Sequence, residues 1–157
     1  MDAFEAALNT LLMDTYHSIM KVEEEMLQNN GQLDLSIGEL HMIEFIAKDR
    51  DRGKTISEIA ENQNLTLPSV TVAVNKLVKK GFVEKERCQE DARVVWVKVS
   101  RQGRKADTIH RYFHRQMIRS ITGELTEEDR ASLLVGVSKL NDFFHKKLAE
   151  MHGMEAK

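Results

Sequence analysis

Two closely spaced helix starts, at Thr55 and Thr66, constrain the fold of this chain more than any other feature of its sequence. Thr55 and Glu58 form the pattern of a capping box, in which each side chain accepts a hydrogen bond from the backbone N–H of the other residue. Thr66 is a second favourable N-cap residue. The pattern predicts one helix over Ile56–Asn62, a short turn, and another helix over Leu67–Lys80, which together make a helix-turn-helix.

The second of these helices divides into two faces. Val70, Val74 and Leu77 are spaced four and three apart, so they share one face and are predicted to be buried. The opposite face combines small polar residues near the helix start with lysines further on, as in a helix that reads the major groove of DNA. The outward-facing residues are Ser69, Thr71, Val72, Asn75, Lys76 and Lys79.

Two extended segments follow this helix, which ends at Gly81. They are Phe82–Arg87 and Arg93–Val99, and the second alternates valines with other residues, as a strand with one buried face does. A charged tip that contains Asp91 separates them. A β-hairpin directly after a helix-turn-helix predicts a winged helix.

Long helices with apolar stripes are predicted on both sides of this central region. One ends near Asn29-Asn30-Gly31, Ser36 caps the next, Ser100 caps another that reaches about Ile121, and Leu125–Asp129 opens the last. The predicted fold is mainly α with a small β-hairpin wing, in one compact domain.

The first and last helices carry more apolar length than one small winged helix can cover, which predicts a homodimer. Residues 1–35 and 100–157 then form the helical dimerisation region, and residues 36–99 form the DNA-binding region. A two-fold dimer would present two reading helices one DNA turn apart, at about 34 Å, and so predicts a palindromic operator.

Charge is segregated along the chain although the net charge is only −2. Residues 69–119 hold 13 Lys or Arg and 5 Asp or Glu, whereas the remaining residues hold 10 and 20. A basic central third predicts contact with a polyanion, and the alternative is an ordinary solvated helix surface.

Other features bound the class of protein. Cys88 is the only cysteine, which excludes an internal disulfide framework and suits a reducing compartment. No apolar run has the length of a membrane span, so we expect a cytoplasmic protein. The chain has no Gly-rich phosphate loop, zinc-hydrolase motif or nucleophile elbow, which argues against an enzyme, and no cofactor is predicted.

The run "TISEIAENQNLTLPSVTVAVNKLVKKGFVEKERCQEDARVVWVKVSRQG" resembles the MarR-type transcriptional regulators. Asp91-Ala-Arg93, the strand "VVWVKV", Ser100 and Gly103 match the wing signature of that family. The resemblance implies that Arg93 enters or borders the minor groove while Asp91 braces the tip. Many members carry Arg at the position of Val72, which can instead contact a thymine methyl group. The predicted DNA-binding residues are Ser69, Thr71, Val72, Asn75, Lys76, Lys79, Arg87, Asp91 and Arg93.

A narrower resemblance is to the FabT-like repressors of fatty-acid synthesis. It is carried by "LSIGELHMIEFIAK", "LTLPSVTVAVNKL" and "HRYFHRQM". It implies a repressor whose DNA binding is tightened by acyl chains on acyl carrier protein, with Arg111, Arg115 or Arg119 as docking charges. The residues assigned to the effector pocket or to carrier docking are Met13, Tyr16, Met20, His41, Met42, Phe45, His110, Arg111, Phe113, His114, Arg115 and Met117.

Three alternatives stay open at this point. Some MarR-type regulators bind zinc with one Glu and three His, and the corresponding set here is Glu24, His41, His110 and His114. Arg111 and Arg115 argue against a cation in that place. The other two alternatives are a MarR-type regulator of another small ligand and an interaction module that does not bind DNA.

Overall fold

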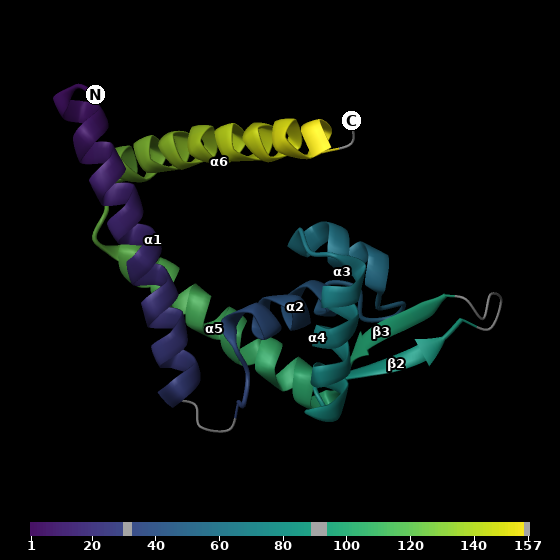
Figure 1. The fold of residues 1–157 in the computed structure, drawn as a ribbon. Helices are drawn as coiled ribbons and strands as arrows, with labels where there is room; N and C mark the ends of the chain where they lie inside the picture. Colours follow the sequence, from purple (N-terminus) through teal and green to yellow (C-terminus); the bar gives the residue numbers. More distant parts are fainter. Residues whose placement is uncertain (30–32, 89–93, 156–157) are drawn as a thin grey trace. The chain divides into compact units, whose positions relative to one another are not determined.

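The structure, a computed structural model, describes residues 1–29, 33–88 and 94–155. The chain divides into two compact units, Met1–Phe113 and His114–Lys157. The first unit contains α1 (Ala3–Asn29), α2 (Ile37–Ala47), β1 (Lys54–Thr55), α3 (Ile56–Gln63), α4 (Leu67–Lys79), β2 (Val83–Arg87) and β3 (Val95–Val99). Helix α5 (Arg101–Gly123) begins in the first unit and ends in the second, which also contains α6 (Glu127–Glu155). The predicted winged helix-turn-helix is confirmed (Figure 1).

Local capping explains where the central helices begin. Thr55 and Glu58 form the predicted capping box at α3, and Ser36 forms a second one with Glu39 at α2. Thr66 accepts from the Ser69 backbone N–H and starts α4. Asn64 ends α3 in the left-handed conformation, at φ 52°, which Asn tolerates better than most residues.

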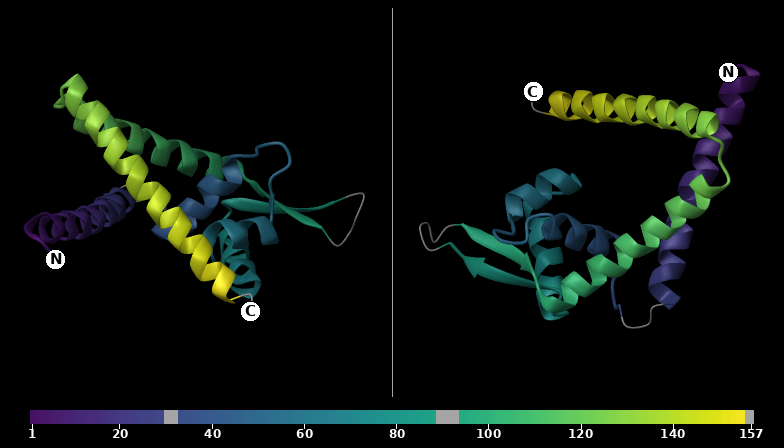
Figure 2. Two further views of the ribbon diagram at one scale, coloured as in Figure 1. Left: turned by 90° about the horizontal axis from the view of Figure 1, so that it is seen from above. Right: turned by 180° about the vertical axis from the view of Figure 1, so that it is seen from behind.

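The hairpin belongs to a three-stranded antiparallel sheet of order β1-β3-β2. Strand β1 lies between α2 and α3, and the sequence pattern did not predict it. Gly53 explains how it pairs, because its φ of +81° and its missing side chain let it approach β3: a Cβ there would lie 2.4 Å from the Val97 carbonyl oxygen. Both Figure 1 and Figure 2 show β2 and β3 projecting beyond α3 and α4.

The core of the first unit lies beneath α4. Val70, Val74 and Leu77 are each fully buried, as the spacing predicted, and they join apolar residues of α2, α3 and the sheet in one cluster. Burial of such side chains contributes about 1.5–3 kcal/mol each, so this stripe fixes which face of α4 is outward.

Ser100 connects the sheet to α5. Its Oγ donates to the Gly81 carbonyl oxygen at 2.6 Å and accepts from the Gly103 N–H at 3.1 Å, which confirms the predicted cap. The Ser100 N–H donates to the Phe82 carbonyl oxygen at 3.0 Å. The base of the hairpin is thereby joined to the first turn of α5.

The long helices carry large apolar side chains on their surfaces. In α1 these include Phe4, Leu11 and Tyr16, and in α6 they include Leu134 and Phe143. In the part of the chain that the structure describes, no helix has the length and hydropathy needed to cross a membrane.

Candidate nucleic-acid interface

Helix α4 presents its predicted outward face to solvent. Ser69, Val72, Asn75 and Lys79 are exposed, and Val72 is 69% exposed although it is apolar. Thr71 is half-buried, and its hydroxyl donates to the Leu67 carbonyl oxygen at 2.8 Å. The hydroxyl proton of Thr71 is therefore used within the helix, and only its acceptor capacity faces outward.

The hairpin is attached to this helix by a side-chain contact that the sequence pattern did not reveal. Lys85 on β2 donates from Nζ to Asn75 Oδ1 at 2.6 Å. This contact assigns Oδ1 of Asn75 as the acceptor, so the NH2 group of the same amide remains available as a donor. Arg87 is exposed at the end of β2, whereas Asp91 and Arg93 lie outside the described residues.

Lys76 of α4 and Lys80, the C-cap residue of that helix, are both paired with one carboxylate of α2. Glu39 of α2 is only 7% exposed. Its Oε2 lies 3.0 Å from Lys80 Nζ, and its Oε1 lies 3.1 Å from Lys76 Nζ. Burial raises the pKa of Glu39, but hydrogen bonds from Ser36 and Lys80 and the ion pair with Lys76 outweigh it and leave the pKa below its usual value. Lys76 was predicted as a DNA contact, and the pairing with Glu39 was not.

A second ionic group braces the sheet beside α3. Arg52 contacts the Glu58 carboxylate and lies 3.4 Å from Asp49 Oδ2. Its guanidinium stands 4.7 Å from the centre of the Trp96 ring, in a cation–π arrangement. The capping box of α3 and the outer side of β3 are therefore held together by one arginine.

Three residues converge where α1, α2 and α5 meet in the first unit. Glu23, His41 and His110 place ligand atoms within 4.8 Å of one another. His41 Nε2 lies 3.6 Å from Glu23 Oε2, and His110 Nε2 lies 3.8 Å from Glu23 Oε1. On its other side, His110 Nδ1 lies 3.4 Å from Glu44 Oε2.

This cluster differs from the four-residue zinc set predicted as an alternative. The carboxylate that joins the histidines is Glu23, which is buried, and not Glu24, which is exposed. His114 lies one turn after His110, at the start of the second unit, and is half-buried. Three N and O donors fit a zinc site in number only if water or a further ligand completes the usual four.

Beside this cluster lies a buried carboxyl group of α5. Asp107 is 4% exposed, and its Oδ2 lies 2.9 Å from Arg111 Nη2. Burial raises the pKa of Asp107, Arg111 opposes that change, and the neighbouring Glu44 adds to it, so the pKa remains above its usual value. Together with Glu44, Ala47 and Lys48, these two residues line a small pocket of about 110 Å³.

The residues predicted for an effector are divided among several environments. Met42 is part of the core, whereas Met20, Phe45 and Phe113 are half-buried against it. Met13 and Tyr16 are exposed on α1. Of the predicted set, His114, exposed Arg115 and half-buried Met117 belong to the second unit.

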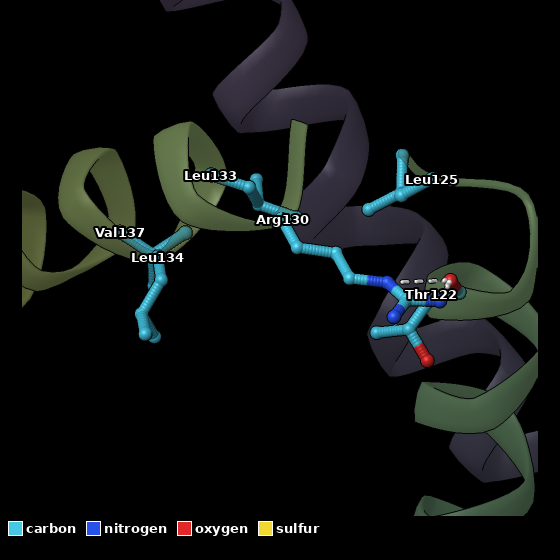
Figure 3. A pocket seen from close by; sticks show the side chains of 6 residues that line it. All are labelled: Thr122, Leu125, Arg130, Leu133, Leu134 and Val137. Atoms are coloured by element: carbon cyan, nitrogen blue, oxygen red, sulfur yellow. Dashed lines mark hydrogen bonds between the residues drawn. The ribbon is translucent and has the colours of Figure 1, made fainter. Parts of the chain in front are cut away.

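The second unit has an apolar hollow of about 360 Å³ between the end of α5 and the start of α6. Arg130 crosses it to donate to the Thr122 carbonyl oxygen from Nε and Nη2, at 3.2 and 2.8 Å (Figure 3). These bonds hold the guanidinium against the end of α5, and the rest of the lining is leucine and valine. The other lining residues are Leu125, Leu133, Leu134 and Val137.

Comparison with known proteins agrees with this geometry. Residues 16–108 match the family described as transcriptional regulator SarA/Rot. The chain is 33% identical over 86 residues to an uncharacterised HTH-type transcriptional regulator, YwhA, of Bacillus subtilis; the match spans 55% of this chain and 62% of that protein. A second uncharacterised regulator of this type from Bacillus subtilis, YhjH, is 23% identical over 66% of this chain and 59% of its own length. The chain thus spans about three fifths of these two relatives.

Solved structures extend the similarity over most of the chain. Streptococcus pneumoniae FabT, in complex with DNA, superposes with a TM-score of 0.86 and 30% identity, covering 90% of this chain and 98% of that one. AbsC, a MarR family transcriptional regulator from Streptomyces coelicolor, shares the fold with a TM-score of 0.73 at 14% identity, covering 93% of this chain and 97% of that one. The predicted resemblance to MarR-type regulators is confirmed, and these relatives are transcriptional regulators and not enzymes.

Proposed function

We propose that this chain, which belongs to the SarA/Rot family of transcriptional regulators, is a repressor that places α4 in the major groove of double-stranded DNA. The observation that carries the proposal is the division of α4 into a fully buried valine and leucine stripe and an exposed polar face. The structural similarity to FabT, which was solved on DNA, supports it.

On this proposal, the exposed residues of α4 and of the hairpin make different kinds of contact with DNA. The Asn75 amide, oriented by Lys85, is suited to donate to a base edge, and the Val72 methyl groups are suited to contact thymine. Lys79 and Arg87 are exposed cations suited to phosphate. Arg93 stays the proposed minor-groove probe, with Asp91 as its brace.

We further propose that the functional form is a homodimer on a palindromic operator. The exposed apolar side chains of α1 and α6, and the apolar hollow lined by Leu133 and Leu134, are surfaces that a second copy would cover. Residues 1–35 and 100–157 would then provide the dimer contacts, and residues 36–99 the DNA contacts.

The salt dependence of DNA binding tests the main proposal. The protein is titrated onto a random-sequence duplex and onto a palindrome that it has itself selected from a randomised pool, between 50 and 300 mM salt. A protein that neutralises phosphates should bind with a log–log slope of about −0.9 for each phosphate contacted. Binding that is independent of salt, or that does not distinguish the two duplexes, would contradict it.

The proposed effector is an acyl chain carried on acyl carrier protein, and the proposed targets are fatty-acid synthesis genes. The similarity to FabT supports this assignment, as do the half-buried Met20, Phe45 and Phe113. Arg115 and Arg119 are exposed and suit an acidic carrier, whereas Arg111 is already paired with Asp107.

Titration with carrier protein tests the effector. We expect acylated carrier protein to tighten binding to the selected palindrome, while unacylated carrier protein leaves it unchanged. Equal effects of the two forms would contradict the fatty-acid role and leave the DNA-binding proposal intact.

A second candidate function is regulation by zinc, favoured by the convergence of Glu23, His41 and His110. Metal content and zinc affinity of the protein, measured with and without a His110→Ala change, separate the candidates. Near-stoichiometric zinc that is lost in the variant would favour the metalloregulator, and zinc binding that is unaltered would exclude this cluster as its site.

A further inference from the structure

The carboxylate of Glu39 on α2 partly neutralises the positive charge at the C-terminal end of α4. Glu39 occupies the third position of α2, where Oε2 accepts from the Ser36 N–H at 2.8 Å as half of the capping box. The same oxygen accepts from Lys80 Nζ at 3.0 Å, while Oε1 forms its ion pair with Lys76. Glu39 thus caps its own helix, α2, and also forms ion pairs with two lysines at the C-terminal end of α4.

The three lysines at the C-terminal end of α4, namely Lys76, Lys79 and the C-cap residue Lys80, are therefore not equivalent. Lys80 is 18% exposed and also donates to the Asp34 carbonyl oxygen at 2.7 Å, so it is held in place. Lys76 is 60% exposed, at a surface that phosphates can reach, yet its ammonium is paired. Lys79 forms no ion pair with any residue in ranges 1–29, 33–88 and 94–155.

We infer that Glu39 is a specificity-determining residue, which withholds Lys76 and Lys80 from DNA phosphates and so lowers affinity for DNA of any sequence. This inference rests on the proposed function. Non-specific binding comes almost entirely from phosphate neutralisation, whereas specific binding adds contacts to base edges. In a non-specific complex the protein can shift its position to bring a freed cation onto a phosphate, whereas base contacts fix the register of a specific complex. A counter-charge beside the lysines therefore weakens non-specific binding more than specific binding and increases discrimination.

Glu39 is suited to act as a constant counter-charge and not as a switch. Its hydrogen bonds hold its pKa below the usual value, so it stays ionised at neutral pH. Of the two partners in the ion pair, Lys76 is exposed and Glu39 is buried: their side chains are 60% and 8% exposed. Lys76 is thus the cation that would turn towards phosphate once the carboxylate charge is removed.

The direct test is Glu39→Gln, which keeps a side-chain oxygen for the Ser36 N–H and removes the charge. Binding is measured to a random-sequence duplex and to the selected palindrome over a range of salt. We expect the slope of log binding constant against log salt concentration to become steeper by about one for each copy of α4 on DNA. This corresponds to about a tenfold gain in affinity per copy near 0.1 M salt. The random-sequence duplex should gain more than the palindrome, because the register of the palindrome complex is already fixed by base contacts.

A double-mutant comparison identifies the lysine involved. Lys76→Gln alone should change the salt slope little, because Lys76 is already paired with Glu39. Adding Lys76→Gln to the Glu39→Gln protein should restore the wild-type slope. If Lys76→Gln alone removes a full phosphate contact, the inference is overturned. That variant leaves Glu39 and its cap in place, so it decides the matter even where Glu39→Gln fails to fold.

Glu58→Gln is the matched control. Glu58 occupies the same capping-box position in α3 but pairs with Arg52 and not with the lysines of α4. We expect its removal to leave the salt slope unchanged. Wild-type protein that shows no salt-dependent DNA binding would overturn the proposed function, whereas normal wild-type binding with an unaltered slope in Glu39→Gln would overturn only this inference.

Discussion

Replacing Gly103 by alanine tests how α5 is joined to the base of the hairpin. A Cβ at Gly103 would lie 2.1 Å from the Phe82 carbonyl oxygen and 3.4 Å from Val99 Cβ. The first contact is with backbone, so it cannot be relieved by turning a side chain. Because contacts with carbon are most favourable near ~3.5 Å, the first turn of α5 must move by roughly 1 Å or more.

The cost follows from what that movement disturbs. Overpacking of this kind costs about 1–3 kcal/mol. The Phe82 oxygen also accepts from the Ser100 N–H at 3.0 Å, and weakening this bond adds about 1 kcal/mol. Alanine returns about 0.5–1 kcal/mol through its better helix propensity. We therefore expect Gly103→Ala to lower the free energy of unfolding by about 1–3 kcal/mol.

Urea unfolding followed by circular dichroism measures the change, at one fixed protein concentration because dimerisation would contribute to stability. Gly38→Ala is the control in the same unit, since a Cβ at Gly38 in α2 meets nothing within 4 Å. We expect that variant to be as stable as the wild type or slightly more so. A Gly103→Ala protein of wild-type stability would refute the reasoning, because a clash with backbone at this distance cannot be absorbed freely.

Three further predictions concern local structure. Thr66→Ala removes the hydrogen bond to the Ser69 N–H that starts α4 and should cost about 1 kcal/mol in urea unfolding, whereas Thr66→Ser should retain most of it. Asn64→Ala should cost about 1 kcal/mol because φ is 52° there, and a thermal melt should place Asn64→Gly closer to the wild type. Asp107 has a raised pKa, so the stability it contributes is present below its ordinary value of 3.8 and is lost as pH rises through the folded value. Asp107→Asn should therefore raise the free energy of unfolding relative to the wild type at pH 7, and raise it less at pH 3, as measured by urea unfolding at both pH values. The reverse order would show that the ion pair with Arg111 outweighs burial.

The helices and the hairpin could be predicted because their signals are local. A capping box joins residues three apart, a buried stripe repeats every three or four residues, and a strand alternates, so each can be recognised within one element. Thr55, Thr66 and the stripe of Val70, Val74 and Leu77 were assigned in this way. Strand β1 escaped prediction because its two residues pair only with Val97 and Trp96, which are distant in sequence.

The ion pairs of Glu39 escaped prediction for a related reason. Glu39 forms a capping box with Ser36, and this local role accounts for the carboxylate without reference to any other helix. Its pairing with Lys76 and Lys80 depends on how α2 packs against α4, and the pattern of one helix does not contain that information. On sequence alone, Lys76 was an exposed cation like Lys79.

The carboxylate beside the histidines was missed by a single residue, and helical geometry explains why. Glu23, Glu24 and Glu25 are consecutive, so they point about 100° apart around α1, and composition does not distinguish them. Only Glu23 lies three and four residues before Met26 and Leu27, the buried residues near the end of the helix. Positions three and four apart share a face, so the one acidic residue in phase with that apolar pair is the one that faces His41 and His110. The sequence therefore contained the signal that distinguishes Glu23. It was missed because the apolar stripe of the first turns of α1 is exposed, so that stripe does not show which face is buried at the C-terminal end of the helix.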